Sequence, residues 1–461
     1  MINRRNFLKA SAASSLAGTG ALNLSLNSAH AAVAPNDFKT IVCVYLDGGN
    51  DSFNMLVPNT TAEYDAYARS RGALAHDRSA LQSITPRGLG ANSFGLHPNM
   101  PELKNMFDNG EASFIANVGP LIEPTSKADI VNGSASLPTG LGGHNTGSSY
   151  WKGDHDSTVN ASGDGIGGRL ANEFVNNAEL PMLISAGAGY DLFLNHAEQP
   201  VYGISPAGLV LMRDYNLAQA SRFASVPATA RRAALEKLNM LGVNDENLFM
   251  QHSGQLLSQG LNLSLTAQEL LGDIPPLGVE FPAAPFTNVS QHLRRAAEMV
   301  SIREGLGMRR QIIYVRATGF DTHDALNAFH APAMAELSAS LAAFNETMKL
   351  LDMDSSVLTY TASDFSRTLT NTGDGTDHAW GGPQVLMGGG IKGGELFGSY
   401  PVLELDSDDD YNGDGRMIPT ASVTQHAATI AKWFGVPQNR LSAVVPNIVN
   451  FSGQEDLGFF A

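Results

Sequence analysis

Acidic and imidazole side chains gather between residues 311 and 380. The apolar run IIYV leads to Asp321 and His323, the run VLTYTA leads to Asp364, and a third short segment offers Asp377 and His378. Carboxylates and imidazoles at the carboxyl ends of neighbouring strands are where an open α/β sheet builds its site. Asp and His side chains are also ligands of divalent cations. The pattern favours a metal-centred hydrolytic site.

The spacing of these residues supports a shared ion. Asp321 and His323 are two positions apart, so on an extended segment both side chains lie on one face and can meet one ion. The alternative is a capping aspartate beside a surface histidine. Asp364 is either a ligand or the partner of Arg367. His378 is expected in a Gly-rich loop, which would let it approach a metal closely, although a purely structural role stays open.

A second acidic segment follows the first predicted strand. The run KTIVCVYL, within residues 38–46, is continuous, apolar and rich in β-branched residues, which is typical of a buried strand. It leads into DGGNDSFN, with Asp47, Asn50 and Asp51 at the carboxyl end. We expect at least one of the two aspartates to complete the site. An Asx-type turn, in which these side chains bond only the backbone, is the alternative.

Residues 119–165 are predicted to be a long polar loop rich in Gly and Ser, and loops of this length are often functional. The residues expected to line the site are His144, Thr146, Ser148, Ser149 and Trp151. Thr146, Ser148 and Ser149 are candidate nucleophiles, because a hydroxyl held near a metal ionises more easily. Arg316 or Arg367 is a candidate to hold an anion. Two ions bound by the acidic and imidazole groups would clamp an oxyanion and activate a water.

Strand and helix patterns alternate along the chain. Strands are predicted at 38–46, 112–118, 181–185, 308–317, 357–362 and 384–387, and helices at 63–71, 101–107, 165–175, 332–351 and 422–434. This alternation indicates an α/β fold with a mostly parallel sheet covered by helices on both faces. Residues 206–304 are mostly helical in pattern and are predicted to form an insertion or cap on one domain that covers 33–461.

Net charge and cysteine content limit the classes of partner and of metal site that the chain can have. The 461-residue chain has a formal net charge of -16, which disfavours nucleic acid and anionic membranes as general partners. An anionic substrate remains compatible, because a bound metal can reverse the local sign. Cys43 is the only cysteine, so an intrachain disulfide and a CxxC metal site are both excluded. No segment after the leader reaches transmembrane length.

Residues 1–32 have the pattern of a targeting segment. Arg4 and Arg5 precede a weakly apolar run, and Ala29-His30-Ala31 is a small-x-small cleavage site. The pattern matches a bacterial twin-arginine signal, so the Tat translocase is an expected partner. We expect the mature protein in the periplasm or outside the cell.

The segment DSDDDYNGDGR is a separate acidic feature. Asp408, Asp410, Asn412, Gly413 and Asp414 match the first half of an EF-hand-type calcium loop. The twelfth position is Pro419 instead of Glu. A solvated surface loop is the favoured interpretation, and a weak calcium site is the alternative.

These motifs resemble those of the bacterial DUF1501 family, which belongs to the alkaline phosphatase-like, or sulfatase-like, superfamily. The matching pieces are the twin-arginine leader, LDGGNDSFNMLVP, HNTGSSYWKG, GFDTH, ASDFSR in place of the usual S-E-F-G-R, GTDHAWGG and GRMIPTASVTQHAATIAKWFG. They span nearly the whole mature chain. The resemblance implies an α/β/α sandwich with metal ions at the strand ends.

The resemblance also suggests roles for individual residues. Asp47 or Asp51 resembles the first-strand ligand, Asp321 and His323 resemble the pair on one metal, Asp364 the later strand-end aspartate, and His378 the final histidine ligand. Two departures stand out. Phe365 occupies the place where the superfamily commonly has His, and His144-Asn145-Thr146 stands where the nucleophile is expected, which makes Thr146, with His144 and Arg367, the catalytic candidates.

Two functions follow as hypotheses. The first is an exported hydrolase of small phosphate or sulfate esters that uses a divalent ion such as zinc, manganese or calcium. The second is a non-catalytic exported protein that uses the same fold to bind a ligand or to help assemble a surface structure. Phe365 favours the second hypothesis, and the Asp and His residues at the strand ends favour the first.

Overall fold

The computed structural model describes residues 36–154, 163–178, 180–187, 191–205, 228–244, 246–271 and 274–460. The predicted leader, 1–32, lies outside these ranges, as do 155–162 of the predicted loop and 206–227 of the predicted insertion.

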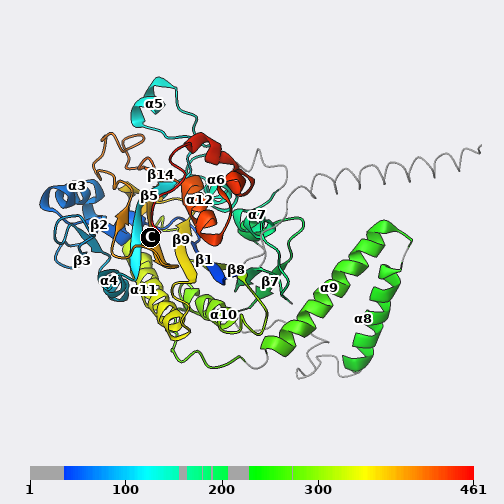
Figure 1. Cartoon of the computed structure of the whole chain (residues 1–461). Coiled ribbons are helices and arrows are strands. Elements are labelled where there is room, and N and C mark those ends of the chain that lie inside the picture. Colours follow the sequence, from blue (N-terminus) through cyan, green and yellow to red (C-terminus); the bar gives the residue numbers. More distant parts are fainter. Residues whose placement is uncertain are drawn as a thin grey trace, which may run out of the picture.

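A nine-stranded mixed sheet forms the centre of the molecule (Figure 1). Its strands are β1 (Lys39–Leu46), β5 (Ala112–Gly119), β6 (Leu183–Ala186), β7 (Val201–Ile204), β8 (Arg310–Ala317), β9 (Val357–Ser363), β12 (Gly382–Gly388), β13 (Leu396–Phe397) and β14 (Ala421–Ser422). The order is β13-β5-β12-β9-β1-β8-β6-β7, and β14 also pairs with β5. The strands from β9 to β7 run parallel, whereas β12 is antiparallel to both of its neighbours.

Helices cover both faces of this sheet (Figure 1). The helices are α2 (Ser52–Met55), α3 (Thr61–Arg71), α4 (Pro101–Asp108), α5 (Lys127–Asn132), α6 (His144–Gly153), α7 (Ile166–Asn172), α8 (Ala228–Val243), α9 (Leu248–Leu271), α10 (Val289–Ser301), α11 (Leu326–Leu350), α12 (Val423–Phe434) and α13 (Leu441–Val444). Short 3₁₀ turns occupy Gly72–Leu74, Leu192–Leu194, Gln438–Arg440 and Pro446–Phe451. The predicted α/β/α sandwich with a mostly parallel sheet is confirmed.

Strand β1 packs against a hydrophobic core on each face of the sheet. Val42, Val44 and Leu46 pack on the side of α10 and α11. The alternate residues Ile41, Cys43 and Tyr45 pack on the side of α7 and α12. Because successive side chains of a strand point to opposite faces, a continuous apolar run is what a sheet covered on both faces requires.

Two smaller sheets flank the main one. A three-stranded sheet contains β2 (Leu56–Pro58), β4 (Phe94–Leu96) and β3 (Gln82–Ile84), and a hairpin contains β10 (Arg367–Thr372) and β11 (Gly375–His378). His378 therefore ends a strand, whereas the sequence predicted a Gly-rich loop. The hairpin is anchored beside the predicted site, since the Thr376 amide donates to the Thr322 carbonyl at 3.1 Å.

Several predicted boundaries differ from the structure. The predicted loop 119–165 contains helices α5 and α6, which polar and glycine-rich sequences concealed. Helix α11 begins at Leu326 rather than at Pro332, because Leu326 and His330 are buried and packing stabilises the added turns. Helix α10, which the prediction placed in the insertion, buries its apolar face in the core beside β8.

The acidic loop is also partly different from its prediction. Asp408 is exposed, but Asp410 is fully buried. The Asp410 carboxylate accepts the backbone N–H groups of Asp406, Asn412 and Gly415. Asp410 thus organises the loop through the backbone, as an Asx turn does, and its oxygens are already engaged.

Candidate metal centre

Three adjacent parallel strands bring the predicted acidic residues to one edge of the sheet. In the order β9-β1-β8, Leu46 lies beside both Ala317 and Ser363. Asp47, Asp321 and Asp364 follow these strand ends within a few residues. The sheet topology therefore explains why residues separated by more than 300 positions share one site.

Glycines allow the connecting segments to approach closely. Gly48 has φ +116°, and a Cβ there would lie 2.6 Å from the Asp321 amide nitrogen. In helix α6, a Cβ on Gly147 would lie 2.2 Å from the Asp364 carbonyl oxygen. Both distances are far below any real carbon contact. These two glycines let the loop after β1 and the helix α6 close around the ends of β8 and β9.

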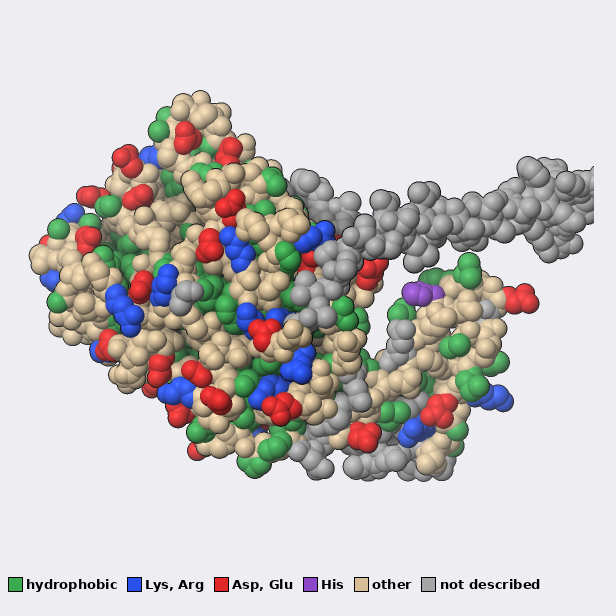
Figure 2. Space-filling view, viewed as in Figure 1, with side chains coloured by type: hydrophobic (Ala, Val, Ile, Leu, Met, Phe, Trp, Pro, Cys, Tyr) green, Lys and Arg blue, Asp and Glu red, His purple; other side chains and the backbone are tan. Residues whose placement is uncertain are grey.

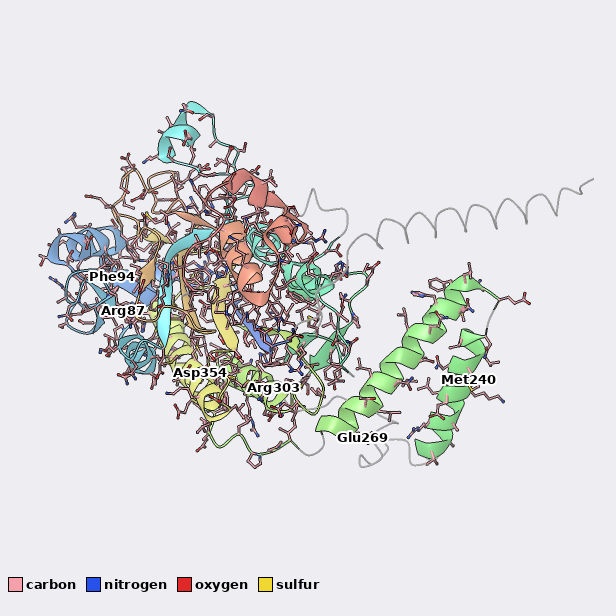
Figure 3. All side chains as sticks on the ribbon, viewed as in Figure 1. Arg87, Phe94, Met240, Glu269, Arg303 and Asp354 are labelled. Atoms are coloured by element: carbon pink, nitrogen blue, oxygen red, sulfur yellow. The ribbon has the colours of Figure 1, made fainter. Side chains whose placement is uncertain are left out.

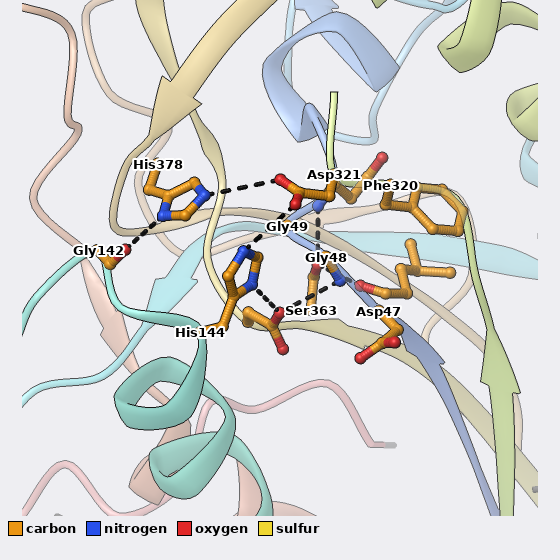
Figure 4. Close-up of polar contacts among 12 residues, drawn as sticks. Asp47, Gly48, Gly49, Gly142, His144, Phe320, Asp321, Ser363 and His378 are labelled. Atoms are coloured by element: carbon orange, nitrogen blue, oxygen red, sulfur yellow. Dashed lines mark hydrogen bonds and ion pairs between the residues drawn. The ribbon is translucent and has the colours of Figure 1, made fainter. Parts of the chain in front are cut away.

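Three histidines surround Asp321. Figure 4 shows two of them, His144 and His378. The Nε2 atoms of His144 and His378 each lie 3.6 Å from an Asp321 carboxylate oxygen, and His323 Nε2 lies 3.1 Å from one. The Nε2 atoms of His323 and His378 are 2.8 Å apart. His144, which the sequence linked to catalysis, thus joins Asp321, His323 and His378.

The other ring nitrogens fix the tautomers. His378 Nδ1 is 2.6 Å from the Gly142 carbonyl, which can only accept, so Nδ1 carries the proton. His144 Nδ1 is 2.8 Å from a carboxylate oxygen of Asp364. Donation from both Nδ1 atoms leaves the Nε2 lone pairs directed toward Asp321. A metal-binding histidine commonly has its second nitrogen held by a carboxylate or a carbonyl in this way.

The spacing of the candidate ligand atoms suits a metal ion. Two ligands of a tetrahedral zinc ion, each about 2.0–2.1 Å from the metal, lie roughly 3.3–3.4 Å apart. The 3.6 Å separations of His144 and His378 from Asp321 are too long for hydrogen bonds but close to this edge length. His323 Nε2 lies closer, at 2.8 Å from His378 Nε2 and 3.1 Å from Asp321, which are hydrogen-bond distances that would have to lengthen around an ion. The ligand atoms of His144, Asp321 and His378 all lie within 4.8 Å of one another, as do those of His323, Asp377 and His378. The donor set fits a divalent ion.

Burial and the neighbouring Arg367 keep His378 and Asp321 in the protonation states that a metal requires. Burial lowers the pKa of His378, the Gly142 carbonyl opposes that effect, and the Arg367 charge lowers the pKa further. Burial would raise the pKa of Asp321, but its hydrogen bond and ion pair with Arg367 outweigh this, so the pKa is lowered. A neutral imidazole and an ionised carboxylate are the forms that bind metals.

Arg367 is a positioning residue. It is fully buried and donates to the carbonyl oxygens of Gly48, Gly49 and Phe320 as well as to the Asp321 carboxylate. All of these acceptors belong to the loops after β1 and β8. The structure therefore gives Arg367 no access to a substrate anion, in contrast to its predicted catalytic role.

Asp364 also differs from its prediction as a direct ligand. Its side chain is only 3% exposed. One oxygen accepts the Tyr45 hydroxyl proton, and the other contacts His144 Nδ1 and the Gly48 amide. Burial and the Asp364 charge raise the pKa of Tyr45 well above its usual value, so this hydroxyl stays a donor. Asp364 therefore orients His144, and it also lines the cleft that opens beside His144 and Asp321.

Three further residues that the sequence predicted for the site lie outside the group of histidines around Asp321. Asp47 lies at the rim of the site, where it forms an ion pair with Arg316. Asp51 is fully buried in an ion pair with Arg71. Thr146 lines a separate small cavity.

A cleft of about 650 Å³ opens beside the metal candidates. Its polar lining includes Asp47, His144, Asn145, Ser148, Arg316, Asp321 and Thr322, and its apolar lining includes Phe286 and Phe329. Ser148 is therefore the candidate nucleophile that faces this cleft. Ser149 is buried and bonds the Asn145 carbonyl, one turn earlier in α6.

Phe365 fills the space beneath the histidines. Its ring centroid lies 4.9 Å from that of His144 and 4.4 Å from that of His378. A histidine at this position was the superfamily expectation. The aromatic ring instead supplies packing that holds two imidazoles in place.

Sequence reasoning missed several supporting residues. Tyr45 was interpreted only as part of an apolar strand, and the Gly142 carbonyl carries no side-chain signal. Arg416 donates to the His378 carbonyl at 2.7 Å and pairs with Asp377 at 3.3 Å. Each acts through a contact between distant segments, which no local motif reveals.

One family model matches part of the chain. Residues 287–440 match the family described as "Protein of unknown function (DUF1501)". The matched segment holds Asp321, His323, Asp364 and His378, whereas His144 comes from the preceding part of the chain. The predicted resemblance to DUF1501 is confirmed.

Similarity to solved structures is weak in sequence. The sulfatase PsFucS1 from Pseudoalteromonas sp. is 11% identical, with a TM-score of 0.34, and the match covers 87% of this chain and 68% of that one. A mutant of the alkaline phosphatase PafA is 10% identical, with a TM-score of 0.28, over 73% and 64% of the two chains. No curated protein sequence matches the chain. Among the described residues, no helix has the length and apolar character needed to cross a membrane.

Proposed function

We propose that this chain is an exported, metal-dependent hydrolase of small phosphate or sulfate esters. The observation that carries the proposal is the convergence of three imidazole Nε2 atoms on the Asp321 carboxylate, with two Nδ1 atoms held by Asp364 and Gly142. The Asp321 and His323 side chains are 48% and 45% exposed, so a ligand can reach them.

The donor types favour zinc among the candidate ions. Imidazole nitrogen suits zinc and other transition metals, whereas calcium prefers oxygen ligands alone. A divalent ion held here would act as a Lewis acid on an ester oxygen and would lower the pKa of a water. His144, Asp321, His323 and His378 would hold it, and Asp364 and Gly142 would orient two of the imidazoles.

The cleft supports an anionic substrate. Arg316 stands at the cleft with its side chain 47% exposed, although it is paired with Asp47. The first turn of α6 also reaches the cleft through His144 and Asn145. A helix N-terminus favours negative charge because its first backbone N–H groups have no partner within the helix. Ser148 lies on the same helix and is positioned to meet the substrate.

A non-catalytic binding role is the second candidate, and Phe365 favours it. This ring occupies the space where an additional histidine would be needed for a second ion. The two candidate functions would share a single ion and differ in whether a bound ester is hydrolysed.

Metal content and ester hydrolysis distinguish the two functions. The mature protein should be exported through its own leader, purified, and analysed for metals by elemental analysis. We expect about one equivalent of metal per chain. We also expect hydrolysis of 4-nitrophenyl phosphate or 4-nitrophenyl sulfate that EDTA abolishes and added zinc restores.

A matched pair of variants controls for loss of structure. The double variant His323→Ala/His378→Ala should lose the metal and retain its circular dichroism spectrum. His252→Ala changes an exposed histidine of α9 and should keep both metal and activity. Retained metal in the double variant would contradict the site. Full metal content without turnover of any ester would favour the binding role.

The export part of the proposal rests on the leader sequence. Arg4 and Arg5 in residues 1–32 are the twin arginines. Replacing both with lysine should leave the precursor inside the cell, while the unchanged chain reaches the periplasm or the medium. Normal export of the double lysine variant would remove the twin-arginine assignment.

A further inference from the structure

Helices α8 and α9 form a hairpin beside the body of the molecule (Figure 1). Half of the large hydrophobic side chains that are exposed in the described part of the chain lie on it. They are Leu238, Met240, Leu241, Leu248, Phe249, Met250 and Leu256. Hydrophobic side chains are visible on the face of the hairpin in Figure 2, and Figure 3 places Met240 on α8, away from the main body. An exposed group of this size needs an explanation.

The contact between the two helices uses small and polar residues instead. Asn239 Nδ2 donates to Ser258 Oγ at 2.5 Å. A Cβ on Gly254 would lie 2.5 Å from the Val243 amide nitrogen, so the backbones touch here. The large apolar side chains therefore contribute little to the packing of α8 on α9. They point away from it.

Helix α9 also lacks the charged face of a solvated helix. Among its 24 residues, Glu269 is the only one of the Asp, Glu, Lys and Arg types. A helix that faces water normally carries charged residues along one side. The outer surface of α9 thus has the composition of a helix that is buried against a partner.

The turn of the hairpin argues against insertion into a lipid bilayer. It has the sequence Asn-Asp-Glu-Asn at 244–247, so acidic and amide groups stand at its far end. These groups would have to enter the bilayer first. The apolar side chains lie along the helices on either side of this turn. The chain's net charge of -16 also repels anionic lipids.

We propose that the hairpin is a dimerisation element, in which the hairpins of two copies pack into a four-helix bundle. A two-helix hairpin supplies half of such a bundle, and a two-fold axis lets one apolar surface meet itself. Residues 228–271 contain three basic and four acidic residues, a net of -1, within a chain of -16. Contact through this nearly neutral element avoids strong repulsion between the two acidic bodies.

The exposed side chains would contribute to a dimer contact. Those that share a face of the hairpin would supply the apolar part of the roughly 800 Å² that each partner buries in a standard-size interface. Their fractional exposures range from 47% at Met250 to 77% at Phe249. The proposal does not depend on the metal site.

The test is the mass of the mature protein in solution, measured by sedimentation equilibrium and light scattering. We expect a dimer at micromolar concentration. Met240→Glu/Phe249→Glu should raise the dimer dissociation constant at least 100-fold. Val402→Glu/Val449→Glu alters two exposed hydrophobic positions on the body and should leave the dimer unchanged.

Cysteine cross-linking tests the location directly, because the native Cys43 is buried. Under mild oxidation, Phe249→Cys should form an intermolecular disulfide, and Val449→Cys should not. A wild-type monomer at tens of micromolar would overturn the proposal. A monomer that floats with phosphatidylcholine vesicles would assign the surface to a membrane instead. A dimer that survives Met240→Glu/Phe249→Glu, with no cross-link at position 249, would also overturn it.

Discussion

Asp364→Asn is the substitution that best tests how the site is built. The aspartate is 3% exposed and contacts His144 Nδ1 at 2.8 Å, so its role in the structure is to orient a ligand. Asparagine keeps the size of the side chain and removes its charge. One of its two terminal atoms becomes an N–H donor, which cannot serve Tyr45, His144 and Gly48 as the carboxylate does.

The expected loss follows from this arrangement. Substitution of a residue that orients a metal ligand weakens metal affinity about 10- to 100-fold, because the ligand loses basicity and a fixed direction. This corresponds to about 1.4–2.8 kcal/mol of metal-binding free energy. The direct ligands remain, so binding should persist. Metal-free protein should also lose about 1–3 kcal/mol of stability, because the amide leaves at least one of these buried donors without an acceptor.

The assay is a competition for zinc between the protein and a chromophoric chelator at pH 7.4. Asp154→Asn provides a matched control, because Asp154 is 1% exposed and lies at the other end of α6, bonded to Thr424 and Asn447. Burial raises its pKa to about 6, so neutralising it should be tolerated. Wild-type affinity in Asp364→Asn would refute the orienting role. Complete loss of binding would show that Asp364 is a direct ligand.

Three further predictions concern the cleft and the core. Ser148→Ala should lower kcat for ester hydrolysis by several orders of magnitude if this hydroxyl is the nucleophile. Thr146→Val should leave kcat nearly unchanged, because Thr146 lines a different cavity. Steady-state kinetics measure both, and equal effects would contradict the placement. Arg71→Met should lower the free energy of unfolding in urea by about 3–5 kcal/mol, because it leaves the Asp51 carboxylate buried without its charge partner. Adding Asp51→Asn should recover part of that loss. An unchanged free energy of unfolding in Arg71→Met would mean that the pair is not formed. His426 should make stability depend on acid, because burial lowers its pKa to about 3, below the ordinary value near 6.5. The contribution of the neutral His426 side chain to the free energy of unfolding is complete above pH 6.5 and is lost as the pH falls toward 3, by about 1.4 kcal/mol per pH unit. His426→Gln should reduce this dependence of the free energy of unfolding on pH between pH 7 and pH 4. An unchanged dependence would contradict the buried neutral state.

The layers of the fold were predictable because their signals are local. A strand covered on both faces lacks the alternation of apolar and polar residues, and the centres of β1 (IVCVYL) and β8 (IIYV) are continuous apolar runs. Helix α12 was also predicted to within one residue, because a capping box at Ser422 and a left-handed Gly435 mark its two ends. Helix α6 was missed because glycines and hydroxyl residues give it a loop-like composition.

The candidate site was predictable only in part. Asp321, His323 and His378 are brought together as the strand-end pattern suggested, and His144 joins them. The roles of Asp364 and Arg367 depended on their burial and on the hydrogen bonds that each forms inside the protein. Asp51 illustrates the same limit, since its position after β1 suggested a ligand but the fold pairs it with Arg71 inside the protein.

The sequence by itself determined the α/β class, the strand ends that carry acidic and imidazole groups, and the DUF1501 resemblance. Each of these depends on residue types and on spacing along the chain. Only the tertiary structure decided which nitrogen of each histidine faces Asp321, which carboxylates are buried, and which hydroxyl faces the cleft. These properties arise from contacts between segments far apart in sequence, such as Asp364 with His144 across 220 residues. Their geometry is set by how the sheet orders its strands, and spacing along the chain does not encode that order.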